Sequence, residues 1–166
     1  MEPLNPLEKV ENSAVQVNEM VDTILGESLV EIDTYLDKAR EIFNKGDEIL
    51  SQDLDRMILQ IPVYIYNLIV LAQQIEMKKG VAKEHAKYAE NEALLNATGT
   101  VAEKQAKAEL ATVSDRITQT AYLTASSIVT RKIDGAMAIL DSCKKVVQRR
   151  TAELKLTAQA GSAVGF

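Results

Sequence analysis

The sequence has few of the residues from which disulfides, metal sites and tight turns are built. Its 166 residues include one cysteine, one histidine, no tryptophan, 7 glycines and 3 prolines. A single cysteine excludes an internal disulfide, and one cysteine with one histidine excludes a zinc site built from clusters of those residues. The scarcity of glycine and proline, with aromatic residues at 4%, argues against the many turns of a sandwich or barrel. We therefore expect an all-α protein made of long helices.

Features that direct a chain to a membrane or out of the cell are also missing. The N-terminus is acidic and has no basic segment followed by an apolar one, so the sequence predicts no signal peptide. The most apolar stretch, Ile61 to Ala72, is shorter than the about 20 residues that a membrane-spanning helix needs, so we expect no membrane contact. A single cysteine fits a reducing compartment, and we expect a cytoplasmic protein.

The residues that commonly carry catalysis have ordinary structural interpretations here. His85 lies in a run of Lys and Glu and has no second histidine at the spacing of a zinc protease, so we interpret it as a surface residue. Cys143 occupies an apolar position and is interpreted as a packing residue, not a nucleophile. Asp53 is placed to cap the start of a helix. We expect neither an enzyme nor a bound cofactor or metal ion.

The charges are unevenly distributed along the chain. Residues 1–76 carry 15 Asp and Glu against 5 Lys and Arg, whereas residues 77–166 carry 9 against 14. The net charge of −5 argues against a protein whose whole surface is covered by nucleic acid. The charge of the C-terminal half nevertheless allows a basic face, and such a face would favour binding of a polyanion.

Apolar spacing and turn residues predict the order of the helices. We expect an irregular arm over residues 1–12, one helical domain over 13–160 and a flexible tail over 161–166. Within the domain, acidic helices over 13–60 precede a basic helical hairpin over 62–160, with Pro62 in the first turn of the hairpin. The apolar run after Pro62 also fits a β-strand, but the sequence offers no partner strand, so we favour a helix.

Short segments carry the signals that start and stop these helices. Gly26 is a stop signal, and residues 28–31 and 100–103 both fit the capping box, in which a hydroxyl and a carboxylate satisfy free backbone donors. The strongest break, Asn96–Gly99, divides the hairpin. The last helix is expected to run from Thr100 to about Ala160, with a kink near Gly135.

The clearest periodic pattern lies in this last helix. Small and apolar residues recur at alternating steps of four and three, which places them on one helical stripe. A repeat of this kind is typical of a helix that packs lengthwise against other helices, so we predict a long hairpin or bundle completed by oligomerisation through the C-terminal helix. We call this stripe the seam, and its positions assigned to the interface between copies are Val129, Ile133, Ala136, Leu140, Cys143, Val147 and Leu154.

Two basic clusters lie in the C-terminal half. The first follows every fourth residue along one helix face and has an aromatic neighbour, and the second lies within residues 131–155. Such clusters are commonly solvated surfaces that pair with acidic neighbours. Their functional interpretation is contact with nucleic-acid phosphates, with the aromatic ring available to an unpaired base. The residues assigned to nucleic-acid binding are Lys78, Lys79, Lys83, Lys87, Tyr88, Arg149 and Arg150.

The segments around these clusters resemble the UvsY-type recombination mediators of phages. The similar parts lie within residues 60–161 and include the stretches IEMKKGVAK at 75–83, TVAEK at 100–104, AILDS at 138–142 and AQAG at 158–161. The resemblance implies a small helical protein without enzymatic activity that assembles into a ring through its C-terminal helix. It also implies that Lys79, Lys83 and Lys87 contact single-stranded DNA, and that the partners are a phage recombinase and a single-strand-binding protein.

The pattern and the resemblance together predict a non-enzymatic homo-oligomer that binds single-stranded DNA and helps load a recombinase in the cytoplasm of a phage-infected bacterial cell. The alternative is a structural or adaptor helical oligomer, such as a virion component or an inhibitor of a host factor, without nucleic-acid binding. Binding of an oligonucleotide distinguishes the two.

Overall fold

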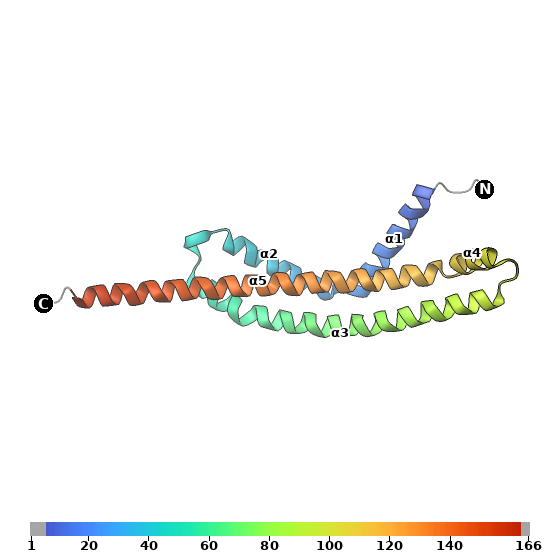
Figure 1. The fold of residues 1–166 in the computed structure, drawn as a ribbon. Helices are drawn as coiled ribbons and strands as arrows, with labels where there is room; N and C mark the ends of the chain where they lie inside the picture. The colour runs from blue at the N-terminus through green and yellow to red at the C-terminus, as the bar shows by residue number, and fades with distance from the viewer. Residues whose placement is uncertain (1–5, 164–166) are drawn as a thin grey trace. The chain divides into compact units, whose positions relative to one another are not determined.

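The protein is described by a computed structural model over residues 6–163. No strand occurs in this range, and the prediction of an all-α fold is confirmed (Figure 1). The elements in chain order are the helix α1 (Pro6–Leu25), the short 3-10 helix η1 (Gly26–Leu29), α2 (Val30–Phe43), the short 3-10 helix η2 (Gly46–Glu48), α3 (Ser51–Asn96), α4 (Val101–Ala111) and α5 (Val113–Ala163).

The chain forms two compact units, and both contain part of α3 and part of α5. The first unit contains the chain up to Ser28 together with Val70–Thr130, and the second contains Leu29–Ile69 together with the residues from Arg131 onward. Each unit adds one N-terminal helix, α1 in the first and α2 in the second, to its parts of α3 and α5.

Both ends of the described range are more helical than expected. Residues 6–12 belong to the first turns of α1 instead of an irregular arm, while residues 1–5 lie outside the described residues. Pro6 begins the helix, a position where its missing N–H has no partner to lose. At the other end α5 continues to Ala163, so of the predicted tail over 161–166 only residues 164–166 lie outside the described range.

The prediction that a helix ends near Gln60 and another starts at Pro62 is wrong. The helix α3 runs from Ser51 to Asn96 with Pro62 in its interior. An interior proline costs about 3 kcal/mol, because it removes one backbone hydrogen bond and crowds the preceding turn. Ile61 and Leu68 on either side of it have no exposed surface, and burial of each such side chain contributes about 2 kcal/mol. Packing of the helix therefore outweighs the local penalty.

The last helix is interrupted at Thr112, and α5 passes through Gly135 without interruption. Thr112 is buried, and its hydroxyl donates to the carbonyl of Ala108 at 2.9 Å. The Ala108 carbonyl also accepts the Thr112 backbone N–H at 3.1 Å, and the Arg116 backbone N–H bonds the Thr112 carbonyl at 3.0 Å at the start of α5. The sequence signals this break neither with glycine nor with proline.

The predicted stop and start signals have different outcomes. Gly26 has a φ of +53° and follows the last residue of α1, as predicted. The helix expected to start at Ser28 begins two residues later, because α2 starts at Val30 and its N-cap residue is Leu29, which makes no side-chain capping bond. The capping box over 100–103 is confirmed: the Thr100 N–H donates to Glu103 Oε2 at 2.8 Å, and the Glu103 N–H donates to Thr100 Oγ1 at 3.4 Å.

In the first unit α3 and α5 run antiparallel, and alanines make up part of their buried faces. Ser126 on α5 donates to Glu76 on α3 at 2.5 Å, and Asp115 pairs with His85 at 2.9 Å, so residue numbers fall along α5 as they rise along α3. Ala121 and Ala125 on α5 have no exposed surface. Since alanine side chains are short, the facing helices can approach closely. Val21 and Leu25 at the end of α1 are also buried in this unit.

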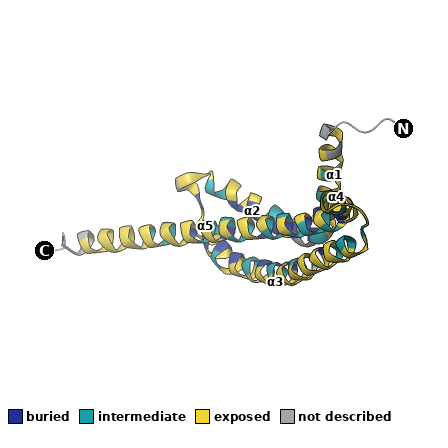
Figure 2. Cartoon of the chain, turned by 45° about the vertical axis from the view of Figure 1, so that its right-hand side comes forward, coloured by how far each residue is buried: buried dark blue, intermediate teal, exposed yellow. Residues whose placement is uncertain are grey.

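The second unit has a core of larger apolar side chains. The first turns of α3 bury Leu54, Met57 and Ile61, and the buried residues of α2 follow helical spacing. Buried positions lie along one side of each helix, with exposed residues on the other side (Figure 2). This one-sided burial is typical of amphipathic helices. The buried residues of α2 are Ile32, Leu36 and Ala39, and those that α5 contributes to this unit are Ala136 and Cys143.

Candidate nucleic-acid interface

The four lysines of the first basic cluster lie on α3 in the first unit, but they point to different faces of the helix. Lys83 and Lys87 are one turn apart and share a flank, whereas Lys78 lies on the opposite flank of the helix. Lys79 is turned toward the packed side and is half-buried. The four lysines therefore do not form one continuous track, although Lys79, Lys83 and Lys87 recur every four residues.

Lys79 is held by the acidic side chain of the preceding turn. Its Nζ lies 2.6 Å from the carboxylate of Glu76, which also accepts the hydrogen bond from Ser126. The hydrogen bond from Lys79, followed by that from Ser126, lowers the pKa of Glu76 below its usual value. Because this carboxylate stays ionised, Lys79 is already neutralised within its own chain.

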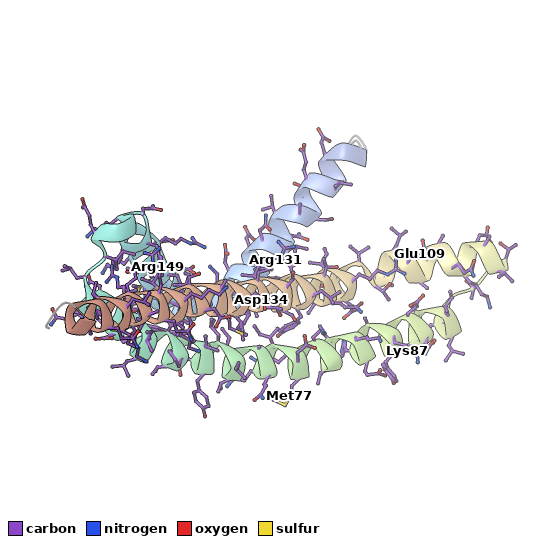
Figure 3. All side chains as sticks on the ribbon, turned by 60° about the vertical axis from the view of Figure 1, so that its left-hand side comes forward. Met77, Lys87, Glu109, Arg131, Asp134 and Arg149 are labelled. Carbon is purple, nitrogen blue, oxygen red and sulfur yellow. The ribbon has the colours of Figure 1, made fainter. Side chains whose placement is uncertain are left out.

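Lys83 and Lys87 are available to a ligand. Both side chains are exposed, and neither makes a hydrogen bond or an ion pair with any described residue. Lys87 extends outward from α3 (Figure 3). The ring of Tyr88, in the same turn, is 68% exposed. Two unpaired cations beside an exposed ring are the combination that a phosphate and an unstacked base can use.

A shallow groove lies next to this cluster within the first unit. It has a volume of about 510 Å³ and an apolar lining that includes Met77, Val81 and Tyr122. The pair of His85 Nδ1 and Asp115 Oδ1, 2.9 Å apart, lies at its side. The interpretation of His85 as a surface residue is consistent with its exposure, and the pair fixes the ring against α5.

The second basic cluster lies on α5 in the second unit and is largely engaged. Arg149 Nε lies 3.7 Å from Glu153 Oε1, and Arg150 Nη1 lies 3.5 Å from Ser51 Oγ. Lys132 forms an ion pair with Asp33 on α2. Lys144 and Lys145 are exposed and make no hydrogen bond or ion pair with a described residue. These two lysines belong to the predicted basic cluster but were not assigned to nucleic-acid binding, and they are more accessible to an anion than the two assigned arginines.

The seam on α5 is divided between buried and exposed positions. Val129, Ala136 and Cys143 have no exposed surface in the single chain, whereas Leu154 is 71% exposed. The positions between them, Ile133, Leu140 and Val147, are partly buried. The assignment of these seven residues to an interface between copies stays a prediction. Because Val129, Ala136 and Cys143 are buried within the single chain, a second copy could not contact these three side chains in this arrangement.

An exposed apolar stripe on α3 was missed in the sequence. Met77 is 70% exposed and Val81 is 71% exposed, and together with Tyr88 they follow steps of four and seven on the side of α3 away from the core. In the second unit Leu59 and Val63 on α3 are exposed in the same way. The spacing of these residues in the sequence is a signal for the stripe, but lysines lie between them along the chain.

The uncharged part of α3 is longer than the apolar stretch noted in the sequence. No Asp, Glu, Lys or Arg occurs from Met57 to Ile75, a longer interval than Ile61 to Ala72. Within the described residues α3 is the one helix long and apolar enough to cross a membrane, and 17% of its most apolar window is buried. Core helices of soluble proteins pass the same test, so this is weak evidence, and it assigns no compartment.

The protein is therefore all-helical in its described part, and it exposes both lysines and apolar side chains on the long helix α3. No group of three or more His, Cys, Asp or Glu side chains that could hold a metal ion occurs within residues 6–163 as far as they are described. Comparison of the chain with protein-family models, curated proteins and solved structures finds no match. The resemblance to the UvsY-type mediators therefore stays a prediction.

Proposed function

We propose that the protein is a non-enzymatic oligomer that binds single-stranded DNA and acts as a recombination mediator, with a recombinase and a single-strand-binding protein as partners. The observation that supports this proposal best is the surface formed by Lys83, Lys87 and Tyr88 on α3. Its two cations are exposed and have no partner among the described residues, and its aromatic ring is exposed beside them.

The chemistry of this surface suits a single strand better than a duplex. Lys83 and Lys87 lie one turn apart, about 6 Å along the helix axis. Each lysine neutralises one phosphate and releases its counterions, and Tyr88 offers a face on which a base of any sequence can stack. No base-specific contact is required, which fits a protein that acts on DNA of any sequence.

Two or three phosphate contacts in one subunit give weak binding. An oligomer presents the same contacts several times, and once one subunit has bound, the others meet the strand at a high effective concentration. The oligomer as a whole then binds the strand tightly, although each single lysine–phosphate contact forms and breaks readily. A mediator needs this property, because it must hold a strand while other proteins replace one another on it.

The decisive experiment is a fluorescence polarisation titration with a single-stranded oligonucleotide at several salt concentrations. The double variant K83A/K87A should bind more weakly, and its salt dependence should be shallower by about 0.7 per lost phosphate contact. The matched control K38A/K45A removes the same charge from exposed positions outside the first unit and should bind like the unchanged protein.

Two results would contradict the proposal in different ways. Equal binding by K83A/K87A and the unchanged protein would reject the assignment of the surface. The absence of any binding at low salt would reject the function and favour the alternative, a structural or adaptor oligomer that does not bind nucleic acid.

A further inference from the structure

The outer side of α3 in the first unit carries apolar side chains that no described residue covers. Met77, Val81 and Tyr88 are each about two-thirds exposed or more, and Leu95 is 85% exposed. Their numbers are separated by four, seven and seven, which keeps them on one stripe of the helix. Met77 extends away from the helix on its outer side (Figure 3). A stripe with this spacing matches the contact face of a second helix.

The charges beside the stripe are complementary to each other. Glu84 and Lys78 are exposed, and neither makes a hydrogen bond or ion pair with a described residue. They lie three residues after and three residues before Val81. Gly80, beside Val81, has no side chain, and a Cβ there would have no neighbour within 4 Å, so another helix can approach closely at this point.

We propose that a second copy of this chain docks on this stripe, with the two α3 helices antiparallel and a two-fold axis near Val81. In that register the Glu84 of each copy faces the Lys78 of the other, so the axis creates two identical ion pairs. The interface is isologous, because the same patch is used on both copies. Met77, four residues before Val81, is then covered by the other copy.

The same charges argue against other occupants. In a parallel pair Glu84 would face Glu84, and like charges in contact destabilise a helical interface. In a lipid bilayer the Glu84 carboxylate would lie within the apolar stripe without a partner, which is costly. An antiparallel copy satisfies the carboxylate and covers the stripe at once.

This interface centres on Val81 and needs neither Lys83 nor Lys87, which lie on a flank of α3. Tyr88, seven residues from Val81, is the residue that the stripe shares with the proposed DNA-binding surface. Failure of self-association would leave the oligonucleotide titration interpretable, and failure of DNA binding would leave the molar mass interpretable. The interface also supplies what the buried part of the seam cannot, an apolar surface that is exposed in the single chain.

The test is the molar mass in solution, measured by light scattering over a range of concentrations, with helix content checked by circular dichroism. The full chain should have twice the 18.3 kDa of a single copy, or an even multiple of it. V81K should shift the mass toward that of one copy. The control L110K places the same charge at an exposed leucine outside α3 and should leave the mass unchanged.

Charge exchange tests the register. K78E and E84K should each weaken association, because each places like charges opposite one another, and the double variant K78E/E84K should restore it. A single-copy mass at the highest soluble concentration would overturn the proposal, as would V81-dependent binding to phosphatidylglycerol vesicles by a protein that stays a single copy. Loss of association in V81K without rescue in K78E/E84K would overturn the antiparallel register.

Discussion

Replacing Gly135 with alanine is expected to stabilise the protein. Gly135 lies in the interior of α5, where a glycine loses more backbone freedom on folding than an alanine does. An added Cβ would have no neighbour within 4 Å outside its own helical turns. The methyl group therefore meets no steric obstacle, and the substitution should show the whole difference in helix propensity.

The size of the effect follows from that difference. Glycine is less favourable than alanine in a helix interior by about 1 kcal/mol. For a chain of 166 residues, a gain of that size in the free energy of unfolding raises Tm by about 2–4 °C. The gain is small, but it has a definite sign and is not offset by lost contacts.

Gly99 provides a matched control with the opposite sign. Its φ of +120° lies in a region that alanine rarely adopts, and a Cβ there would collide with the Glu103 carboxylate of the capping box. Thermal and urea unfolding followed by circular dichroism should therefore rank G135A above the unchanged protein and G99A below it. A G135A variant that melts at or below the unchanged protein would refute the reasoning, as would a G99A variant of full stability.

Two further predictions concern buried groups of the second unit. Burial raises the pKa of the Cys143 thiol, so it should react slowly with a thiol reagent in the folded protein and rapidly in urea; fast reaction without denaturant would contradict its burial. Burial, then the nearby Tyr64, raises the pKa of Tyr35, whose hydroxyl has no hydrogen-bond partner among the described residues. The folded state therefore favours the neutral phenol, so the contribution of Tyr35 to stability should be constant below pH about 10 and fall above it. Y35F should lose less stability than the unchanged protein above pH about 10 in urea unfolding.

The sequence predicted best the elements whose signals are local. The break at Asn96–Gly99 and the capping box at Thr100–Glu103 are formed by residues a few positions apart, and both appear as predicted. The end of α1 at Gly26 is also local, because a positive φ suits glycine. In such segments no distant part of the chain has to be known.

Boundaries that depend on distant packing were predicted less well. Pro62 is a strong local signal for a helix start, but burial of Ile61 and Leu68 keeps α3 continuous through it. At Pro62, therefore, packing of the whole helix prevails over the local preference. Thr112 gives no local signal, yet α4 ends just before it and its side chain is buried.

The candidate site was found in part. Periodicity correctly placed Lys83 and Lys87 on one face, because their spacing alone determines that result. It could not show that Glu76 binds Lys79, since that requires the orientation of the helix against α5. Nor could it tell the buried seam residues from the exposed ones, because a helix with apolar residues on several sides does not indicate which side its own chain covers.

The last part of α5 shows how a helix persists without packing. Every side chain from Thr151 to Ala158 is exposed, so tertiary packing adds little to this stretch. An isolated peptide of this length would be mostly unfolded in water, because forming the first turn is unfavourable. Here the packed turns upstream already provide the nucleus, and each further residue adds a backbone hydrogen bond by propagation alone. Evolution can therefore lengthen or shorten this extension residue by residue while both cores keep their structure.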